Sequence, residues 1–217
     1  MFIACWSVKG GSGTTVVAAS LAVLLARSSP NGALLVDLAG DAPAALGLSE
    51  PSGPGVLAWL AAGPDVGPGA LGRLELDAGL GLAVIPSGEP AGRPSVGRVE
   101  ELSVALAQEP RPVVVDAGRV PSEWADHLVG AATVSLLVLR PCYLALRRAI
   151  AAPLRPSGVV LVTEPGRALS RRDVEDVLGV EVKAEIALDP VVARAVDAGL
   201  LAARLPRPLE RSLRHAA

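Results

Sequence analysis

Aromatic residues, cysteine and lysine are scarce in this chain of 217 residues. Aromatics make up 2% of it while hydrophobic residues make up 51%, so its core has to be built from Ala, Val and Leu. The two cysteines, Cys5 and Cys142, stand in apolar contexts without a paired spacing or neighbouring histidines. This argues against a disulfide framework or a metal site and predicts two small buried side chains.

The sequence also lacks a long apolar run and an excess of positive charge. Its apolar segments stop well short of the ~20 residues that a membrane-spanning helix needs. Met1–Val8 has no basic region of the kind that opens a signal peptide, so we expect a cytoplasmic protein with no transmembrane segment. The formal net charge of -2 disfavours nucleic-acid binding, for which a basic excess is usual.

Short apolar runs alternate with segments of helical character along the chain. The strand-like runs are Phe2–Val8, Ala33–Leu38, Gly81–Ile85, Pro112–Asp116, Val134–Leu139, Val159–Thr163 and Val182–Ile186. The helical segments are Thr15–Arg27, Val96–Gln108, Ser122–Val129, Tyr143–Ala151, Ser170–Leu178 and Pro190–Ala198. This rhythm predicts an α/β fold of three layers, with a mostly parallel sheet of about seven strands between helices. The length suits a single domain, residues 1–217.

Two segments depart from the rhythm. Pro51–Gly72 is rich in Gly and Pro, and we interpret it as a surface excursion with a short helix over Val56–Ala61. The tail, Leu205–Ala217, mixes Leu with Arg and predicts a short amphipathic helix. Docking of this helix on the domain is favoured over a role in peripheral membrane contact.

A glycine-rich loop follows the first predicted strand and leads directly into a helix. It reads Lys9-Gly10-Gly11-Ser12-Gly13-Thr14-Thr15. Glycines allow successive backbone N–H groups to turn inward and surround phosphate oxygens at a helix N-terminus, and the Thr15 hydroxyl would then bind Mg²⁺. Tight packing of a strand against a helix would explain such a loop equally well.

Acidic residues at two strand ends favour the phosphate interpretation. Asp37 ends the second predicted strand and Asp116 a later one, where Mg²⁺ and its waters are held beside such loops. Lys9 is one of only two lysines in a chain that otherwise uses arginine. A compact ammonium at the mouth of the loop suits contact with a phosphate.

The loop resembles the K-G-G-x-G-K-T motif of the deviant Walker A ATPases, the ParA/MinD superfamily of P-loop NTPases. The resemblance extends over nearly the whole chain, through Leu34–Leu48, Gly81–Gly88, Val113–Asp116, Leu136–Ala149 and Ile186–Gly199. The motif V-D-L-A-G-D, Val36–Asp41, looks most like that of the CpaE/TadZ branch, whose members are also described as septum-site-determining proteins. The resemblance implies that ATP or ADP binds at Gly10, Gly11, Ser12, Gly13, Thr14, Thr15 and Asp189, with Mg²⁺ at Thr15, Asp37 and Asp116. It also implies a homodimer in which Lys9 reaches the partner's nucleotide.

The chain departs from the family pattern where chemistry is concentrated. Thr14 replaces the loop lysine that contacts the β- and γ-phosphates, and Val8 replaces a glycine. Ala39 replaces the second acid of a D-x-D motif, which positions the attacking water, although Asp41 stands two residues further on. Thr163-Glu164 replaces an adenine-reading asparagine, and Ala187 replaces a proline ahead of Asp189. These departures predict weakened nucleotide affinity and a degenerate phosphate loop.

Two functions follow, and both stay open on the sequence. The first is a positioning or scaffolding protein with weak or absent hydrolysis, which recruits protein partners in pilus assembly, division or polar localisation. The second is a slow ATPase that uses Lys9 and Asp41 and switches partner, membrane or DNA binding by nucleotide-driven dimerisation. A DNA-partitioning role is disfavoured by the acidic charge, although Arg147, Arg148, Arg167, Arg171 and Arg172 form a basic patch. Pairing of these arginines with Asp173, Glu175 and Asp176 is the simpler interpretation.

Overall fold

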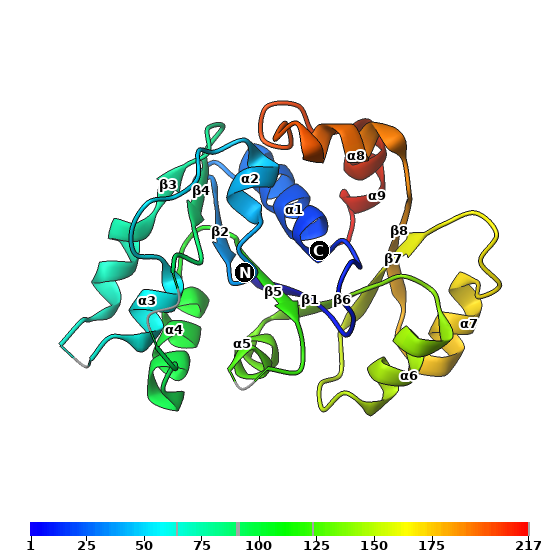
Figure 1. The fold of residues 1–217 in the computed structure, drawn as a ribbon, viewed down its shortest axis with the longest axis horizontal. Helices are drawn as coiled ribbons and strands as arrows, with labels where there is room; N and C mark the ends of the chain where they lie inside the picture. Colours follow the sequence, from blue (N-terminus) through cyan, green and yellow to red (C-terminus); the bar gives the residue numbers. More distant parts are fainter. Residues whose placement is uncertain (64, 90–91, 123, 217) are drawn as a thin grey trace.

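The computed structural model describes residues 1–63, 65–89, 92–122 and 124–216, and within them one sheet of eight strands crosses the molecule (Figure 1). The strand order is β3-β4-β2-β5-β1-β6-β7-β8, and only the β3–β4 pair in this described part is antiparallel. The strands are β1 (Phe2–Ser7), β2 (Ala33–Asp37), β3 (Leu76–Asp77), β4 (Leu82–Ile85), β5 (Val113–Arg119), β6 (Val134–Leu139), β7 (Gly158–Thr163) and β8 (Val182–Ala187). The predicted α/β fold is confirmed, with β3 as the additional strand.

Helices cover both faces of the sheet. One face carries α1 (Thr14–Ser28), α2 (Ala42–Leu46), α8 (Pro190–Asp197) and α9 (Arg207–Leu213) (Figure 1). The other carries α3 (Val56–Ala61), α4 (Val96–Gln108), α5 (Ala125–Ala131), α6 (Tyr143–Ala151) and α7 (Arg171–Leu178), with the 3₁₀ helix η1 (Pro68–Leu74) beside α3 and α4. The three layers expected from the alternation are therefore present.

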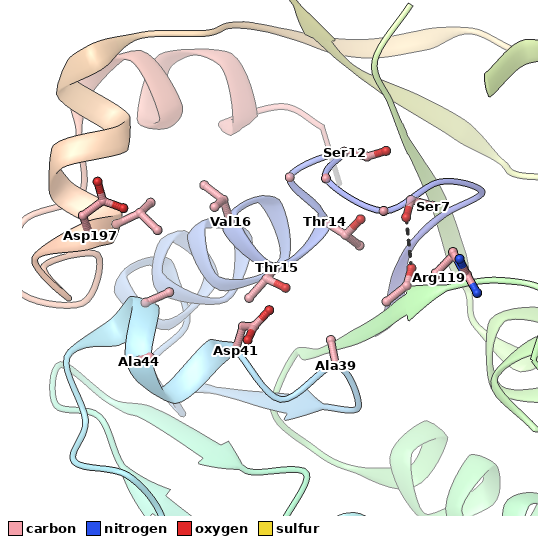
Figure 2. Close-up of a pocket in the computed structure, with 16 residues that line it drawn as sticks. Ser7, Ser12, Thr14, Thr15, Val16, Ala39, Asp41, Ala44, Arg119 and Asp197 are labelled. Carbon is pink, nitrogen blue, oxygen red and sulfur yellow. Dashed lines mark hydrogen bonds between the residues drawn. The ribbon is translucent and has the colours of Figure 1, made fainter. Parts of the chain in front are cut away.

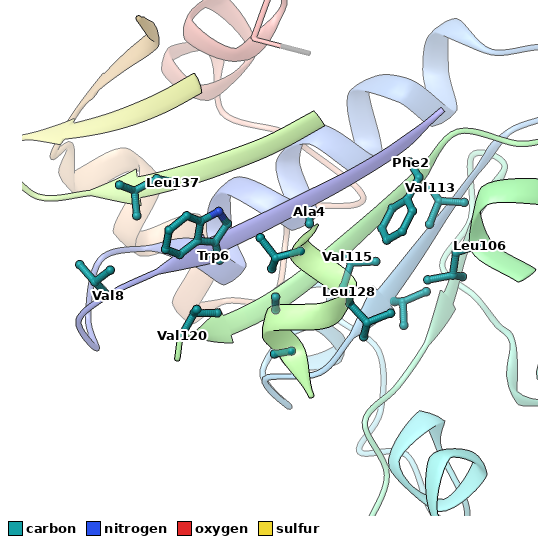
Figure 3. Close-up of a cluster of buried hydrophobic side chains, with 14 of the residues drawn as sticks. Phe2, Ala4, Trp6, Val8, Leu106, Val113, Val115, Val120, Leu128 and Leu137 are labelled. Atoms are coloured by element: carbon teal, nitrogen blue, oxygen red, sulfur yellow. The ribbon is translucent and has the colours of Figure 1, made fainter. Parts of the chain in front are cut away.

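The central strand β1 shows how the sheet forms two cores. Phe2, Ala4 and Trp6 pack in the core beneath α4 and α5, which Figure 3 shows. Ile3 and Cys5 point the other way, toward α1. Successive side chains of a strand alternate between faces, so a strand buried on both sides is apolar throughout. The indole of Trp6 still needs a hydrogen-bond acceptor, and its Nε1–H donates to Ser135 Oγ at 2.9 Å.

The segment over 51–72 is largely exposed on both sides of its helix, as expected of a surface excursion, and residue 64 of it lies outside the described residues. Its helix α3 lies where expected, but Trp59 and Leu60 are buried in the core. Arg98 of α4 stacks on the Trp59 ring at 3.6 Å and its Nη2 donates to the Trp59 carbonyl at 2.9 Å. The helix within the segment is therefore anchored in the core, which the prediction of a surface excursion did not include.

Most other boundaries lie within a residue or two of the prediction, and the larger differences concern α2, β5 and α5. Helix α2 was not expected, and β5 continues past Asp116 to Arg119 because a register shift opposite Cys5 and Ser7 lets the strand go on pairing. The helix expected over Ser122–Val129 begins at Ala125, where the Ser122 hydroxyl accepts a hydrogen bond from the Ala125 N–H at 3.1 Å. Residue 123 of that prediction lies outside the described residues.

The C-terminal helix α9 docks on the domain, as predicted for the tail. Leu209 and Leu213 are buried against α1 and β8. Its apolar side is thus covered by the protein itself; Ala217 of the predicted tail lies outside the described residues. Among the residues that the structure describes, no helix is both long and apolar enough to cross a membrane.

Helix α2 meets the chain after α8 through two glycines. Gly47 and Gly199 have φ values of 84° and 63°, in the left-handed region that glycine tolerates. A Cβ on Gly47 would lie 2.1 Å from the Gly199 carbonyl oxygen, so the two backbones pass with no room for a side chain. The Leu201 N–H donates to the Ala45 carbonyl at 3.3 Å beside this contact.

Candidate functional site

The glycine loop lies between β1 and the N-terminus of α1. Gly11 and Gly13 have φ values of 74° and 89°, which turn the chain sharply before the helix begins at Thr14. The Ser12 hydroxyl donates to the Lys9 carbonyl at 2.7 Å and holds the turn. No acidic side chain stands in the first turn of α1, so its free N–H groups and partial positive charge remain available to an anion.

Two buried carboxylates lie at the same edge of the sheet. Asp37 and Asp116 stand opposite each other on β2 and β5, and both side chains are fully buried. Asp37 accepts hydrogen bonds from the N–H groups of Ala39, Gly40 and Ala42, at 2.9, 2.8 and 3.0 Å. Burial raises the pKa of Asp37 while these three bonds lower it. Asp37 therefore holds the turn that leads to Asp41.

Asp116 differs from Asp37 in its hydrogen bonds. Its Oδ1 accepts from the Gly118 N–H at 3.0 Å, but its buried Oδ2 has no hydrogen-bond partner among the described residues. Burial raises the pKa of Asp116 to about 6, the Thr15 hydroxyl and Gly118 N–H lower it, and the Asp37 and Asp41 carboxylates raise it further. A buried carboxylate with these surroundings is stabilised by a cation.

The residues present fit Mg²⁺ bound with a nucleotide. The free Asp116 oxygen and the Thr15 hydroxyl are the two oxygen donors that would hold it. Within the described residues, no group of three or more His, Cys, Asp or Glu side chains is placed to bind a metal. Mg²⁺ typically takes one or two protein ligands and completes its shell with phosphates and water.

A cavity of about 580 Å³ opens above these groups. Figure 2 shows Thr14, Thr15, Ala39 and Asp41 around it, with Asp41 placed next to Thr15. The rest of the lining includes the loop from Gly10 to Gly13 and the residues Ser7, Val16, Ala44, Ala45, Gly118, Arg119, Val196 and Asp197. The structure thus brings Gly10–Thr15 and Asp41 together in one cavity, directly above Asp37 and Asp116.

Asp189 lines a second, adjoining cavity of about 190 Å³. The two cavities share Gly13, Val16, Val196 and Asp197. Apolar side chains such as Val162, Ile186 and Val192 make up most of the smaller cavity, and Asp189 caps α8 by accepting from the Val191 N–H at 2.7 Å. The two cavities thus adjoin beside Gly13 and the end of α8, and the smaller one is mostly apolar.

Lys9 lies apart from the rest of the predicted site. It is exposed and does not line the cavity, in line with a side chain directed outward. Of the predicted basic patch, Arg171 pairs with Glu175 at 3.0 Å and Arg172 with Asp176 at 3.8 Å, as in the simpler interpretation. Arg167 pairs instead with Glu164.

The cysteine prediction holds for one residue of the two. Cys5 is buried on β1, and burial raises the pKa of its thiol. Cys142 is only partly buried, because it precedes α6 at the edge of a surface groove.

Sequence reasoning missed Ser7, Arg119 and Asp197. Ser7 and Arg119 enter the site because the register shift places them opposite each other on β1 and β5. Their only signal in the sequence is closeness to the loop and to Asp116. Asp197 follows Asp189 by two turns of α8, a spacing that puts both on one side of a helix.

Comparisons with known proteins support the fold. No protein-family model matches the chain, and no curated protein matches it. Solved structures do: MinD of Aquifex aeolicus, a cell division protein, has a TM-score of 0.76 at 18% identity over 99% of this chain and 93% of its own. The septum site-determining protein MinD of Pyrococcus horikoshii, complexed with Mg-ADP, has a TM-score of 0.76 at 19% identity over the same shares. A ParA family ATPase of Chlorobium tepidum has a TM-score of 0.73 at 18% identity, over 97% of this chain and 95% of its own. The chain therefore has the fold of the MinD and ParA ATPases.

Proposed function

We propose that residues 1–217 form a single domain that binds ATP or ADP with Mg²⁺ and acts as a positioning or scaffolding factor with weak or absent ATP hydrolysis. One observation carries the nucleotide site: the glycine loop leads into α1, whose Thr15 stands beside buried Asp116, and one oxygen of Asp116 has no hydrogen-bond partner among the described residues. Phosphates and a cation are the groups that these two features complement.

The linings of the two cavities suggest how a nucleotide would lie in them. The base would occupy the smaller apolar cavity near Asp189, and the phosphates would lie along Gly10–Thr15 in the larger one. Thr15 and Asp116 would hold Mg²⁺, which when bound offsets phosphate charge. Asp37 keeps the 38–42 turn in place beneath the phosphates through its three backbone hydrogen bonds.

Two substitutions support weak turnover, on the resemblance to the ParA/MinD superfamily. Thr14 stands in place of the loop lysine, and losing one charge-assisted hydrogen bond costs about 1.5–3 kcal/mol, roughly 10- to 100-fold in affinity. Ala39 stands in place of the acid that positions the attacking water, a kind of group that supplies ~10²–10⁴-fold in rate. Binding survives the first loss more readily than hydrolysis survives both.

Asp41 favours a second candidate, a slow ATPase. It is exposed, lines the cavity and lies next to Thr15, where a carboxylate can orient a water molecule (Figure 2). In this candidate, nucleotide-driven dimerisation with Lys9 at the partner's nucleotide would switch binding of a protein partner, a membrane or DNA.

The cellular role is inferred from resemblance and from the similar structures. The MinD proteins are described as cell division and septum site-determining proteins, and the third structure is a ParA family ATPase. These descriptions, with the CpaE/TadZ-like wording around Asp37, support a cytoplasmic homodimer that recruits protein partners in division, polar localisation or pilus assembly. Docking of α9 on the domain weighs against its use as a membrane anchor.

Nucleotide binding and hydrolysis are tested separately. Titration with a fluorescent ATP analogue should show saturable, Mg²⁺-dependent binding to the wild type, and phosphate release should stay near the background rate. Slow release that Asp41→Ala abolishes, while Asp176→Ala on exposed α7 leaves it unchanged, would favour the slow ATPase. Absence of nucleotide binding to the wild type would overturn both candidates.

A further inference from the structure

The phosphate end of the cavity lacks the cation that a triphosphate needs. Asp41 and Asp197 line the cavity, and buried Asp37 and Asp116 lie beneath it. Thr14 offers a hydroxyl where a lysine would bring a positive charge. With four carboxylates close by, backbone N–H groups and one Mg²⁺ leave a polyphosphate short of positive charge.

Arg119 is the one basic side chain among the described residues that line this cavity. Lys9 is exposed outside the lining. Arg140 stands near the loop, but its Nη1 donates to the Gly11 carbonyl at 3.4 Å and its Nη2 pairs with Glu164 at 3.2 Å. The Arg119 side chain has no hydrogen bond or ion pair to any described residue. It is therefore available to an incoming anion.

The sheet fixes the backbone around Arg119, whereas its side chain is exposed. Ser7 pairs with Arg119 in register, the Ser7 hydroxyl donates to the Gly118 carbonyl at 3.3 Å, and the Val120 N–H donates to the Ser7 carbonyl at 2.8 Å. Figure 2 shows the guanidinium at the rim, directed away from Thr14. An exposed arginine can change rotamer at small cost to reach the cavity.

The position of Arg119 selects which phosphate it meets. The apolar cavity with Asp189 lies at the α8 side, whereas Arg119 stands with Ser7 and Gly118 on the opposite side of the loop. A nucleotide with its base in the apolar cavity has its last phosphate nearest Arg119. We infer that Arg119 binds the terminal phosphate of a nucleoside triphosphate and supplies the charge that Thr14 lacks. This inference rests on the proposed nucleotide-binding function.

A guanidinium suits this contact. Its planar fork of N–H donors matches two phosphate oxygens at once, and such charge-assisted bonds are about twice as strong as neutral ones. The terminal phosphate of ATP is the γ-phosphate, which ADP lacks. Arg119 should therefore favour ATP over ADP.

The experiment measures ATP and ADP affinity in paired variants. Arg119→Ala should weaken ATP binding by about 10- to 100-fold and ADP binding by less than about 3-fold. The matched control is Arg148→Ala on α6, an equally exposed arginine that lines the neighbouring groove with Arg119 but not the nucleotide cavity. It should change either affinity by less than about 2-fold.

A double-mutant cycle with Thr14→Lys makes the test specific. If lysine and Arg119 supply the same charge, Thr14→Lys should restore ATP affinity to Arg119→Ala, and Arg119→Ala should cost less in the Thr14→Lys background. Wild type that binds ATP while Arg119→Ala and Arg148→Ala both bind it equally well would overturn the inference alone. Wild type that binds neither nucleotide would overturn the inference and the proposed function together.

Discussion

The free energy of unfolding of Asp116→Asn, compared with that of the wild type, should increase progressively as the pH rises. In the folded protein the pKa of Asp116 is about 6, mainly because of burial, against an ordinary value of 3.8. The folded state therefore holds the proton more tightly than the unfolded chain does, and the ionised carboxylate destabilises the fold at neutral pH. This destabilisation is absent below about pH 4 and complete above about pH 6.

The magnitude follows from the difference between the two values. A difference of about 2 pH units corresponds to about 3 kcal/mol at 1.36 kcal/mol per unit. Because Asp116 is fully buried, solvent does little to reduce this. The asparagine amide adds a cost of about 1–3 kcal/mol if it stays unpartnered, but this cost does not depend on pH. The measured quantity is the free energy of unfolding of the variant minus that of the wild type. It should become more positive by about 3 kcal/mol between pH 4 and pH 8.

Urea unfolding followed by circular dichroism at pH 4, 5, 6, 7 and 8 measures this difference. Asp176→Asn on exposed α7 is the control, and its stability difference should stay within about 0.5 kcal/mol at every pH. A difference between Asp116→Asn and wild type that is flat with pH would refute the reasoning, since Asp116 would then be ionised in the folded protein without penalty.

Three further predictions concern the loop, the dimer and the tail. Thr14→Lys should raise ATP affinity in a binding titration by roughly 10- to 100-fold in the Arg119→Ala background and by less in wild type; no gain in either background would mean that the loop is shaped for another purpose. Lys9→Ala should weaken self-association in sedimentation experiments with ATP and Mg²⁺, whereas removal of the other lysine by Lys183→Ala should not; a monomer throughout would leave no support for the dimer. Leu209→Ala in buried α9 should lower the free energy of unfolding by about 2–5 kcal/mol, against less than about 1 kcal/mol for Leu200→Ala, which is 43% exposed; equal losses would contradict tight docking of α9.

The alternation of apolar runs and amphipathic segments was enough to predict the central fold. The helices α4 and α6 and the strand β6 begin and end at the predicted residues. Their buried faces require apolar residues at a regular spacing, which is visible in the sequence. The two-residue β3 and the short α2 leave no such period, since each is held by its neighbours rather than by its own pattern.

The candidate site was predictable in part for a similar reason. Gly10–Thr15 follows β1 and Asp37 ends β2, and the parallel pairing of β2 with β5 brings Asp116 to the same edge. Arg119 was missed because its place depends on a register shift between β1 and β5, and a shift of pairing is decided by tertiary contacts.

The glycine contact between α2 and the chain after α8 links two walls of the cavity beside the glycine loop. Asp41, Ala44 and Ala45 line it from the α2 side, and Val196 and Asp197 from the α8 side. Because Gly47 and Gly199 meet backbone to backbone, we expect a ligand that moves Asp41 also to move the turn after α8 that leads to α9. Occupancy of the phosphate end would then reach α9, whose Leu209 also lines the smaller apolar cavity. A bulky residue at either glycine would push the two walls apart. We expect this to lower nucleotide affinity without any change to the loop itself.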